Sequence, residues 1–344
     1  MGPEIAGFEI ALDATTSIGD RLSGVGVYSR ELLNGLAATG FARGWDWFYR
    51  SQRYWRALRL PKPPNVSRRL LSDSWGSRRA DLFHGLNQRL PRRRFRRQVV
   101  TFHDLFVLSG NYSTSDFRVR FAAQAREAAA GADLIVAVSA FTAGQVEEYL
   151  KVPRERIRVV HHGVLPRGVP KLPREKVVLC VGAIQRRKNQ ASLIRAFRAM
   201  PPDWTLVLAG SRGFGAEDEL REVSERVCVT GYLTDDELAN WYARASIFAF
   251  PSLDEGFGMP VLEAMAAGVP VIAGNRSALP EVCGDAAMLV DPENDEGLAE
   301  SLLMLARDET RRGELVQKGI RRVAEFTWPR AVSATLDVYR RLLD

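Results

Sequence analysis

Residues 250–274 read FPSLDEGFGMPVLEAMAAGVPVIAG and contain most of one repeating structural unit. The apolar run at 246–250 that leads into them is typical of a buried parallel strand. Pro260 suits the first turn of a helix, which we expect over 261–267, and residues 270–273 form the next apolar strand. A strand, a loop, a helix and a strand in this order predict an α/β fold with a parallel sheet.

Two carboxylates lie in this stretch, one on each side of the expected start of the helix. Glu255 falls on the loop after the first strand, and Glu263 falls in the first turn of the helix. In open parallel sheets, ligands bind at the carboxyl ends of the strands. Gly256 and Gly258 leave backbone N–H groups accessible, and a helix N-terminus favours anions or hydroxyl-rich groups. The spacing alone also fits a solvated loop glutamate and a second glutamate that stabilises the helix dipole.

The run EGFGMPVLEAMAAGVPVIA resembles the E-x7-E signature of retaining nucleotide-sugar glycosyltransferases of family four, with Glu255 and Glu263 bracketing seven residues. The resemblance covers nearly the whole chain and is most specific over 180–291. It implies the GT-B fold, an α/β architecture of two doubly wound parallel-sheet, Rossmann-like domains that face a central cleft. The implied divisions are an acceptor-side domain, a nucleotide-sugar-binding domain and a C-terminal helix crossing back onto the first domain, at residues 1–165, 166–327 and 328–344.

Length and composition agree with a two-domain globular protein. A single core stops growing near ~250 to 300 residues, and this chain has 344. Hydrophobic residues make up 46% and charged residues 26%, which excludes a disordered chain. No apolar run approaches the ~18 residues of a membrane span, and the first residues, MGPEIAGFEIALDA, lack the basic segment of a signal peptide. We therefore expect a cytoplasmic protein.

Three cysteines, Cys180, Cys228 and Cys283, lie in or beside apolar runs. Their spacing contains no C-x-x-C pair and no Cys/His pattern of a metal site. We expect all three to be buried thiols in a reducing compartment.

The net charge of +7 is unevenly distributed. Residues 1–170 hold 26 basic and 15 acidic side chains (26 − 15 = +11), and residues 171–344 hold 22 and 26 (22 − 26 = −4). A basic half favours anionic partners such as phosphates, nucleic acid or an anionic membrane surface. The stretch 41–60 interleaves tryptophan and tyrosine with arginine. It fits either a core-facing aromatic stripe or a basic amphipathic helix that touches a membrane or a lipid-linked acceptor.

A second basic feature is the cluster PRRRFRRQ at residues 91–98, which precedes a strand. One interpretation is an ordinary solvated loop. The other is a rim that attracts anions over the acceptor site.

Two glycines, Gly24 and Gly26, stand between a first strand at 8–13 and a helix expected over 27–38. A glycine turn between a strand and a helix suits a phosphate, but the third glycine of the dinucleotide fingerprint is absent, so an ordinary tight turn fits equally well. The resemblance implies that this loop faces the donor diphosphate.

The second half opens with a strand ending at Gly182, followed by AIQRRKNQ. Arg187 and Lys188 stand just before a helix, where cations are electrostatically unfavourable unless an anion joins them. An arginine fork and a lysine together can neutralise a leaving diphosphate. The segment also resembles the family's G-x-x-x-x-R-K-N run, in which this pair holds the pyrophosphate. Arg186 fits the arginine's role equally well from sequence alone.

A histidine, His103, follows an apolar strand in the step FHDL. A lone histidine is more often structural, yet this step resembles the family motif whose histidine contacts the donor sugar. His84, in the similar strand end DLFHG, is a secondary candidate.

The resemblance implies a role for each candidate residue. Glu255 would stabilise or orient the sugar, Glu263 would bind ribose hydroxyls, and the strand end at 231–233 would seat the base. The catalytic candidates are Glu255, His103, Arg187 and Lys188. The donor-binding candidates are Gly24, Gly26, Gly182, Tyr232, Leu233, Phe257, Gly258, Met259, Leu262 and Glu263.

The function that the resemblance implies is transfer of a hexose from a nucleoside-diphosphate sugar to an acceptor hydroxyl with retention. The RKN segment favours GDP-mannose over a UDP-sugar, and the acceptor would be a glycan or lipid-linked molecule of cell-surface polysaccharide or glycolipid synthesis. The nucleotide sugar is a co-substrate, and no bound cofactor is expected. No D-x-D step occurs and cations already occupy the leaving-group position, which predicts transfer without a metal.

Three alternatives differ in chemistry or in class. A phosphorylase or a nucleotide-sugar epimerase with GT-B architecture would keep the fold and change the reaction. A basic nucleic-acid-binding protein would use the arginine cluster and would not need Glu255. We expect no nucleic-acid partner, whereas the basic half is compatible with peripheral contact at the inner face of an anionic membrane.

Overall fold

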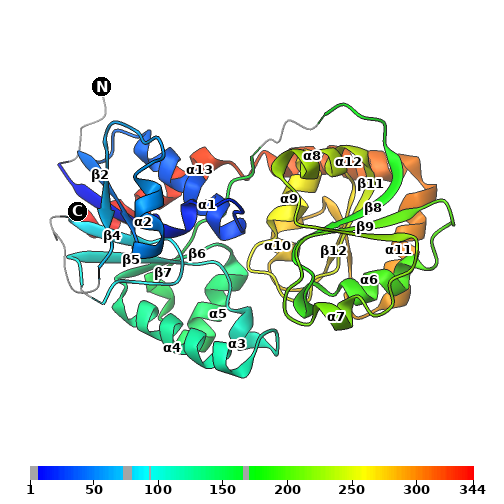
Figure 1. Cartoon of the computed structure of the whole chain (residues 1–344), viewed down its shortest axis with the longest axis horizontal. Helices are drawn as coiled ribbons and strands as arrows, with labels where there is room; N and C mark the ends of the chain where they lie inside the picture. Colours follow the sequence, from blue (N-terminus) through cyan, green and yellow to red (C-terminus); the bar gives the residue numbers. More distant parts are fainter. Residues whose placement is uncertain (1–6, 73–79, 93, 166–169) are drawn as a thin grey trace. The chain divides into compact units, whose positions relative to one another are not determined.

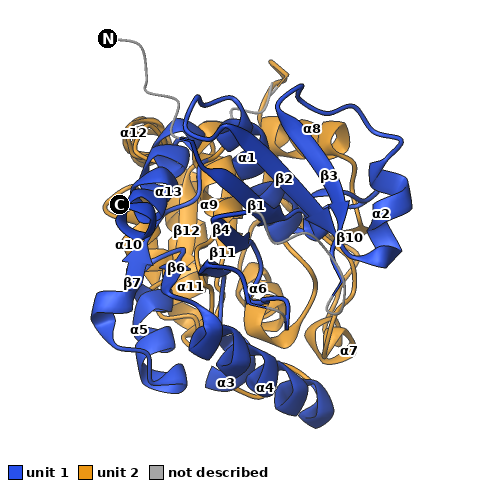
Figure 2. Cartoon of the chain, turned by 90° about the vertical axis from the view of Figure 1, so that its left-hand side faces the viewer, with its two compact units in different colours: residues 1–109, 114–163, 327–344 blue, residues 110–113, 164–326 orange. Residues whose placement is uncertain are grey.

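The computed structural model describes residues 7–72, 80–92, 94–165 and 170–344. Arg93 of the arginine cluster, the first six residues of the chain and part of the predicted boundary at 165/166 lie outside the described residues. The chain divides into two compact units, shown in two colours in Figure 2. Unit 1 comprises residues 1–109, 114–163 and 327–344, and unit 2 comprises residues 110–113 and 164–326.

Unit 1 is built on a seven-stranded parallel sheet in the order β3-β2-β1-β4-β5-β6-β7. Its strands are β1 (Glu9–Asp13), β2 (Gly44–Tyr49), β3 (Val66–Leu70), β4 (Leu82–Gly85), β5 (Arg97–Phe102), β6 (Leu134–Ala137) and β7 (Ile157–Val159). Its helices are α1 (Gly24–Ala37), α2 (Ser51–Ala57), α3 (Phe106–Ser109), α4 (Ser115–Gly131), α5 (Ala140–Leu150) and α13 (Trp328–Leu343), with short turns η1 (Thr15–Ser17) and η2 (Arg154–Arg156).

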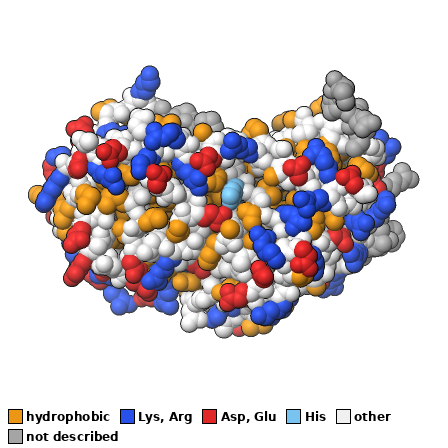
Figure 3. All heavy atoms as spheres, turned by 180° about the vertical axis from the view of Figure 1, so that it is seen from behind, with side chains coloured by type: hydrophobic (Ala, Val, Ile, Leu, Met, Phe, Trp, Pro, Cys, Tyr) orange, Lys and Arg blue, Asp and Glu red, His pale blue; other side chains and the backbone are white. Residues whose placement is uncertain are grey.

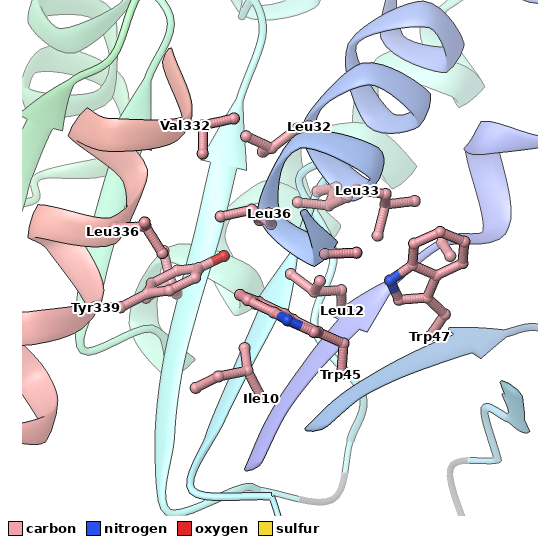
Figure 4. Close-up of a cluster of buried hydrophobic side chains, with 14 of the residues drawn as sticks. Ile10, Leu12, Leu32, Leu33, Leu36, Trp45, Trp47, Val332, Leu336 and Tyr339 are labelled. Atoms are coloured by element: carbon pink, nitrogen blue, oxygen red, sulfur yellow. The ribbon is translucent and has the colours of Figure 1, made fainter. Parts of the chain in front are cut away.

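Hydrophobic core residues cover both faces of this sheet. Helices α1 and α13 cover one face and α4 and α5 the other (Figure 1). Figure 4 shows the core that α1 and α13 cover, where Trp45 of β2 lies between Leu36 of α1 and Tyr339 of α13, and Trp47 lies farther along β2. Burying such large side chains contributes about 1.5–3 kcal/mol each. The last helix of the chain is therefore part of the core of unit 1.

The aromatic and basic stretch at 41–60 was predicted to be either a core-facing stripe or a basic amphipathic helix, and the structure shows features of each in different parts of it. Trp45, Trp47 and Tyr49 are buried, so β2 is a core stripe. Trp55, on the short helix α2, is 72% exposed, and Leu58 just after the helix is also exposed. A single sequence stretch thus supplies a core strand and an exposed apolar and basic turn.

Unit 2 contains a six-stranded parallel sheet in the order β10-β9-β8-β11-β12-β13. Its strands are β8 (Glu175–Val181), β9 (Thr205–Ala209), β10 (Val227–Gly231), β11 (Ala245–Phe250), β12 (Val271–Gly274) and β13 (Ala287–Val290). Its helices are α6 (Gln190–Phe197), α7 (Ala216–Glu219), α8 (Asp235–Arg244), α9 (Met259–Ala266), α10 (Leu279–Cys283), α11 (Asp295–Arg307) and α12 (Glu309–Val323), with the turn η3 (Arg186–Lys188).

The order of strands in unit 2 reverses between β8 and β11. The chain runs outward from β8 to β10 on one side, and from β11 to β13 on the other. Helices α6, α7 and α11 lie on one face of the sheet and α8, α9 and α12 on the other (Figure 1). The helices that follow β8 and β11, α6 and α9, therefore lie on opposite faces of the sheet. A crevice at such a reversal is where open α/β sheets bind ligands.

The structure corrects two expectations from the sequence. Helix α1 begins at Gly24 instead of near residue 27, because the Ser23 hydroxyl caps it by accepting from the Gly26 N–H at 3.4 Å. Cys228 is exposed, whereas Cys180 and Cys283 are buried as expected. Cys228 lies on β10, an edge strand whose outer side no neighbouring strand covers.

None of the helices among the described residues is both long enough and apolar enough to span a lipid bilayer.

Candidate active site

The loops after β8 and β11 meet through the backbone at the reversal point of unit 2. The first loop ends in η3, which contains both Arg187 and Lys188. The N–H of Leu253, on the second loop, donates to the carbonyl of Arg187 at 2.8 Å. The Asn189 side chain donates to the carbonyl of Pro251 at 3.3 Å. These bonds fix the two loops against each other and bring their side chains into one place.

Glu255 lies between the two cations of η3. The Lys188 ammonium donates to Glu255 Oε1, and Arg187 Nη1 lies 3.1 Å from Glu255 Oε2. Arg187 Nη1 also donates to the carbonyl of Asp254 at 2.9 Å. The side chains of Lys188 and Glu255 are each 8% exposed, so this is a buried ion cluster. We call these three side chains, Arg187, Lys188 and Glu255, the cation–carboxylate cluster.

Burial and charge act against each other in this cluster. Burial lowers the pKa of Lys188, and the neighbouring Glu255 carboxylate opposes that effect. Burial raises the pKa of Glu255, but Lys188 and Arg187 outweigh it, so the pKa of Glu255 is lowered and the carboxylate is ionised at neutral pH. The ammonium also lies 4.6 Å from the centre of the Phe250 ring.

The Lys188 ammonium has room for further acceptors. It has three N–H donors, and among the described residues its one hydrogen-bond acceptor is Glu255. A buried cation without enough acceptors is unfavourable, and oxygens of an oxyanion would supply them. The cluster can therefore hold an anion such as a diphosphate beside the carboxylate.

The neighbouring arginine, Arg186, lies elsewhere. Its side chain is 48% exposed and lies 3.5 Å from Asp218, a surface carboxylate. Of the two arginines that the sequence could not separate, the structure brings Arg187 to Glu255.

The segment from Glu255 to Glu263 forms a tight turn into α9. Gly258 has φ +104°, a conformation that favours glycine, and a Cβ there would lie 2.7 Å from Leu279 Cδ2. Glu263 accepts from the Tyr242 hydroxyl at 3.0 Å and is half-buried. Phe257 and Gly258 are buried, Met259 is half-buried, and Leu262 is fully buried.

Three other predicted residues lie at the same edge of this sheet. Gly182 follows β8 with φ +145°, and a Cβ on it would lie 3.5 Å from Lys188 Cε, so the turn passes close to the cluster. Tyr232 and Leu233 follow β10, two strands away from β8 in the sheet order. Tyr232 is exposed and Leu233 is half-buried.

Sequence reasoning missed Ser277 as part of this site. Its hydroxyl accepts from the Glu255 N–H at 3.0 Å, and the carbonyl of Glu255 accepts from the Ala278 N–H at 3.2 Å. Ser277 also has φ +58°, which is uncommon for a residue with a side chain. No local pattern marks this serine, because the contact joins loops 22 residues apart in sequence.

In unit 1, His103 is a buried neutral ring. Its Nε2–H donates to the carbonyl of Leu86 at 2.8 Å, and burial lowers the pKa of His103 to about 4. The ring of Tyr28 packs edge-on against it at 4.7 Å. At neutral pH the remaining nitrogen, Nδ1, is an acceptor, which is the group that could receive a hydrogen bond from a sugar hydroxyl.

His84 has a structural position in the same unit. Its Nδ1 lies 2.6 Å from the Tyr339 hydroxyl and its Nε2 lies 2.8 Å from Thr101 Oγ1. Burial lowers the pKa of His84 to about 3. Both nitrogens are thus occupied, and His84 joins β4 to α13.

The predicted glycines of unit 1 lie in the first turn of α1. Gly24 is exposed, and Gly26 is buried where a Cβ would lie 3.0 Å from the carbonyl of Thr16. Gly26 is therefore needed for close packing of α1 against η1. Within the described residues, no three of the side chains that bind metals gather in one place.

Two family descriptions between them cover most of the chain. Residues 22–166 match "Glycosyltransferase Family 4", and residues 166–322 match "Glycosyl transferases group 1". The O-antigen chain mannosyltransferase B of Escherichia coli is 30% identical over 286 residues, which is 76% of this chain and 74% of that protein. The chain belongs to glycosyltransferase family 4.

Other proteins share part of the sequence or the fold of this glycosyltransferase. The serotype-specific mannosyltransferase WbdA of Escherichia coli is 30% identical over 62% of this chain, but over only 29% of its own length. Sucrose-phosphate synthase from Thermosynechococcus elongatus has a TM-score of 0.77 at 22% identity, over 97% of this chain and 99% of that one. Anabaena HepE, solved with UDP and glucose, has a TM-score of 0.71 at 18% identity, over 98% and 99%.

These similarities confirm the family and the GT-B fold class that the sequence predicted. The glycosyltransferase therefore transfers a glycosyl group. The roles of individual residues stay predictions.

Proposed function

We propose that this protein is a retaining glycosyltransferase that moves a hexose from a nucleoside-diphosphate sugar to an acceptor hydroxyl, with GDP-mannose as its donor. The observation that supports this most is the cation–carboxylate cluster, where Lys188 and Arg187 share Glu255 at the reversal point of the sheet. The name of the Escherichia coli relative, an O-antigen chain mannosyltransferase, supports mannose and a cell-surface polysaccharide or glycolipid as the product.

The cluster matches the charges that such a reaction develops. The bond between the anomeric carbon and the donor's phosphate oxygen breaks, and its electron pair leaves with the diphosphate. Lys188 and Arg187 would neutralise that leaving group, since Lys188 is buried, Arg187 is largely buried, and Glu255 holds both in place. Positive charge develops on the sugar ring, and the ionised Glu255 would stabilise it or orient the sugar hydroxyls. The acceptor oxygen bonds to the same face of the sugar and gives up its proton, which the departing phosphate oxygen can accept.

The remaining predicted residues would position the donor. Glu263 would accept from ribose hydroxyls, and its contact with Tyr242 holds the carboxylate in place. Backbone N–H groups at 257–259 and the turn at Gly182 would lie along the diphosphate and sugar, and Tyr232 and Leu233 would flank the base. The sugar and diphosphate roles that the sequence predicts for His103, Gly24 and Gly26, all in unit 1, stay predictions.

A donor panel tests the proposal. The purified enzyme is incubated with GDP-mannose, UDP-glucose and related donors together with lipid-linked or glycan acceptors, and release of the nucleoside diphosphate is measured. We expect the fastest release from GDP-mannose and an anomeric configuration in the product, read by NMR, equal to that of the donor. EDTA should leave the rate unchanged, because fixed cations already face the leaving group. An inverted product, or release that Glu255→Gln does not slow, would contradict the proposal.

The same panel separates the alternative chemistries. A phosphorylase would release a sugar phosphate when inorganic phosphate is supplied, and an epimerase would convert the donor without an acceptor. The cation–carboxylate cluster favours transfer because it pairs cations for a leaving diphosphate with one carboxylate for the sugar.

We also propose a cytoplasmic location with peripheral contact at the inner face of the membrane. The exposed Trp55 and Leu58 of the α2 region stand beside Arg53 and Arg59, which are also exposed. Apolar side chains flanked by arginines suit an anionic lipid interface. Trp55→Ser should lower co-sedimentation with phosphatidylglycerol vesicles, while Ser51→Ala, an exposed residue of the same helix, should not.

A further inference from the structure

Unit 1 contains a pocket that the proposed donor site does not use. Its volume is about 450 Å³, within the range of small-molecule sites, and it lies beside α4 and the loop residues 89–92 and 94. All of its described lining residues belong to unit 1, whereas the cation–carboxylate cluster belongs to unit 2. Its polar lining side chains include Arg50, Arg89, Arg92, Arg94, Gln124 and Glu127.

The charge of this lining is strongly positive. Four of the described lining side chains are arginines and one, Glu127, is a carboxylate. Arg94 is paired with Asp133 at 3.0 Å. Among the described residues, no carboxylate pairs with Arg50 or Arg89. Guanidinium groups gathered around one cavity repel each other, and a bound anion would relieve that repulsion.

The walls of the pocket are held by hydrogen bonds. The buried Gln98 accepts from the Phe95 N–H at 3.0 Å and donates to the carbonyl of Gly131 at 2.8 Å, which ties the loop to the end of α4. Gln124 of α4 donates to the carbonyl of Gln88 at 3.2 Å. The pocket is thus formed before any ligand enters, which lowers the entropic cost of binding.

The lining also indicates the size and type of the ligand. Guanidinium groups bind phosphate oxygens through parallel N–H donors. None of the described lining residues is aromatic, so the pocket lacks the stacking platforms of single-stranded nucleic-acid sites. Its volume suits a compact anion with a small attached group.

We propose that this arginine pocket binds a phosphate or diphosphate ester, as the charged end of the acceptor or as a phospholipid headgroup. That the ester is part of an acceptor rests on the proposed glycosyl transfer, whereas binding of the anion itself does not. The pocket gives Arg92 and Arg94 of the predicted arginine cluster a specific role, beyond that of solvated surface residues.

The test is calorimetric titration of the protein and four variants with inorganic pyrophosphate. Lys188→Ala removes the proposed diphosphate site of unit 2, and Arg50→Gln/Arg89→Gln removes two cations of the pocket. Arg126→Gln is the matched control, because Arg126 is exposed on α4 and does not line the pocket. Circular dichroism verifies folding, and Arg89→Glu alone is a second pocket variant at an exposed position.

In the Lys188→Ala background we expect one pyrophosphate site that Arg126→Gln leaves intact. Arg50→Gln/Arg89→Gln should weaken that site by about tenfold or more, since each arginine donates charge-assisted hydrogen bonds. The proposal is overturned if the Lys188→Ala protein binds no pyrophosphate, or if the pocket variants bind it as tightly as their background. If Lys188→Ala binds pyrophosphate like wild type, the proposed donor site fails, and the result for the pocket variants is unaffected.

A second titration identifies the source of the phosphate. Dihexanoylphosphatidylglycerol below its micelle concentration presents a phospholipid headgroup without a membrane. Tighter binding of this lipid than of pyrophosphate, abolished by Arg50→Gln/Arg89→Gln, assigns the pocket to headgroups. Tighter binding of pyrophosphate, abolished by the same variant, assigns it to a phosphorylated acceptor. If Arg50→Gln/Arg89→Gln binds both pyrophosphate and the lipid as tightly as its background does, both assignments are overturned.

Discussion

At the residue scale, the proposed chemistry depends on a carboxylate shared by a buried lysine and a largely buried arginine. Lys188 and Glu255 lie 67 positions apart in sequence and form a direct ion pair. Sequence patterns marked both residues, because each belongs to a recognisable run at the end of an apolar strand. The patterns could not show that Arg187 instead of Arg186 enters the site, because adjacent residues of a turn point in different directions. Ser277 was also beyond reach, since only folding brings it to the Glu255 N–H.

Truncating either partner of the ion pair should abolish transfer. Lys188→Ala removes the positive charge that would face the leaving diphosphate, and Glu255→Ala removes the negative charge that would face the sugar. Each substitution should lower kcat by about 10²–10³-fold or more. Release of the nucleoside diphosphate measures the loss. Lys176→Ala, at an exposed lysine paired with Asp203 in the same unit, is the control.

Removing one member of a buried pair also costs stability, so folding must be verified by circular dichroism. Glu255→Gln preserves the shape of the side chain and should be equally inactive. Turnover at the wild-type rate in a folded Glu255→Gln or Lys188→Ala protein would contradict the assigned roles.

The pH dependence of transfer should report the lowered pKa of Lys188. Burial lowers it from the ordinary lysine value of 10.5, so the ammonium loses its proton at lower pH than a surface lysine does. Activity should therefore fall on the alkaline side at a pH below that value. Lys188→Arg should move this alkaline limb upward, because arginine stays charged. An unchanged alkaline limb in Lys188→Arg would exclude Lys188 as the titrating group.

At the element scale, the sequence predicted the sheets better than the ends of the helices. The apolar strands at 246–250 and 270–273 match β11 and β12 closely, because their runs are short, buried and ended by proline or glycine. The start of α1 was missed, because a serine cap at Ser23 allowed two glycines to join the helix. Cys228 was misplaced because an apolar run does not reveal that its strand lies at the sheet edge.

The docking of α13 on β4 depends partly on one buried hydrogen bond. The Tyr339 hydroxyl lies 2.6 Å from His84 Nδ1, and Tyr339→Phe would leave that ring nitrogen without its partner. The change should lower the free energy of unfolding by about 1–3 kcal/mol. Urea unfolding at pH 7 measures this, with Tyr54→Phe, a half-buried tyrosine on the short helix α2, as the control. Equal midpoints for Tyr339→Phe and wild type would show that the bond contributes nothing.

The buried histidines of unit 1 should make stability depend on pH. The pKa is about 3 for His84 and about 4 for His103 in the fold, against 6.5 for an ordinary histidine. Between the folded-state pKa of each ring and 6.5, the unfolded chain binds a proton that the folded chain does not. The free energy of unfolding therefore rises with pH across this range. The loss on acidification is on the order of 3–5 kcal/mol for each ring.

Urea unfolding at pH 5 and pH 7 measures this dependence, and the free energy should be higher at pH 7. His84→Asn should flatten the slope, because one titrating ring is gone. A slope that is identical with and without His84 would mean that its ring is protonated in the folded protein.

At the scale of the whole molecule, the protein consists of two parallel-sheet units, and its two halves in sequence carry net charges of opposite sign. The basic first unit and the acidic second part follow directly from the sequence. On the face drawn in Figure 3, basic and acidic side chains are interspersed, so net charge alone does not define a binding surface. The arginine pocket could not be predicted from the sequence, because its described lining residues, from Arg50 to Gly131, are far apart in the chain and only the fold brings them together.

The central claim is that Arg187, Lys188 and Glu255 form the donor's diphosphate site, and the affinity for GDP tests it most directly. Calorimetry compares the dissociation constant of GDP for wild type, Lys188→Ala and the surface control Lys176→Ala. The account predicts that Lys188→Ala raises the dissociation constant of GDP by about tenfold or more, whereas Lys176→Ala binds GDP like wild type. Equal affinity of wild type and a folded Lys188→Ala protein would contradict it.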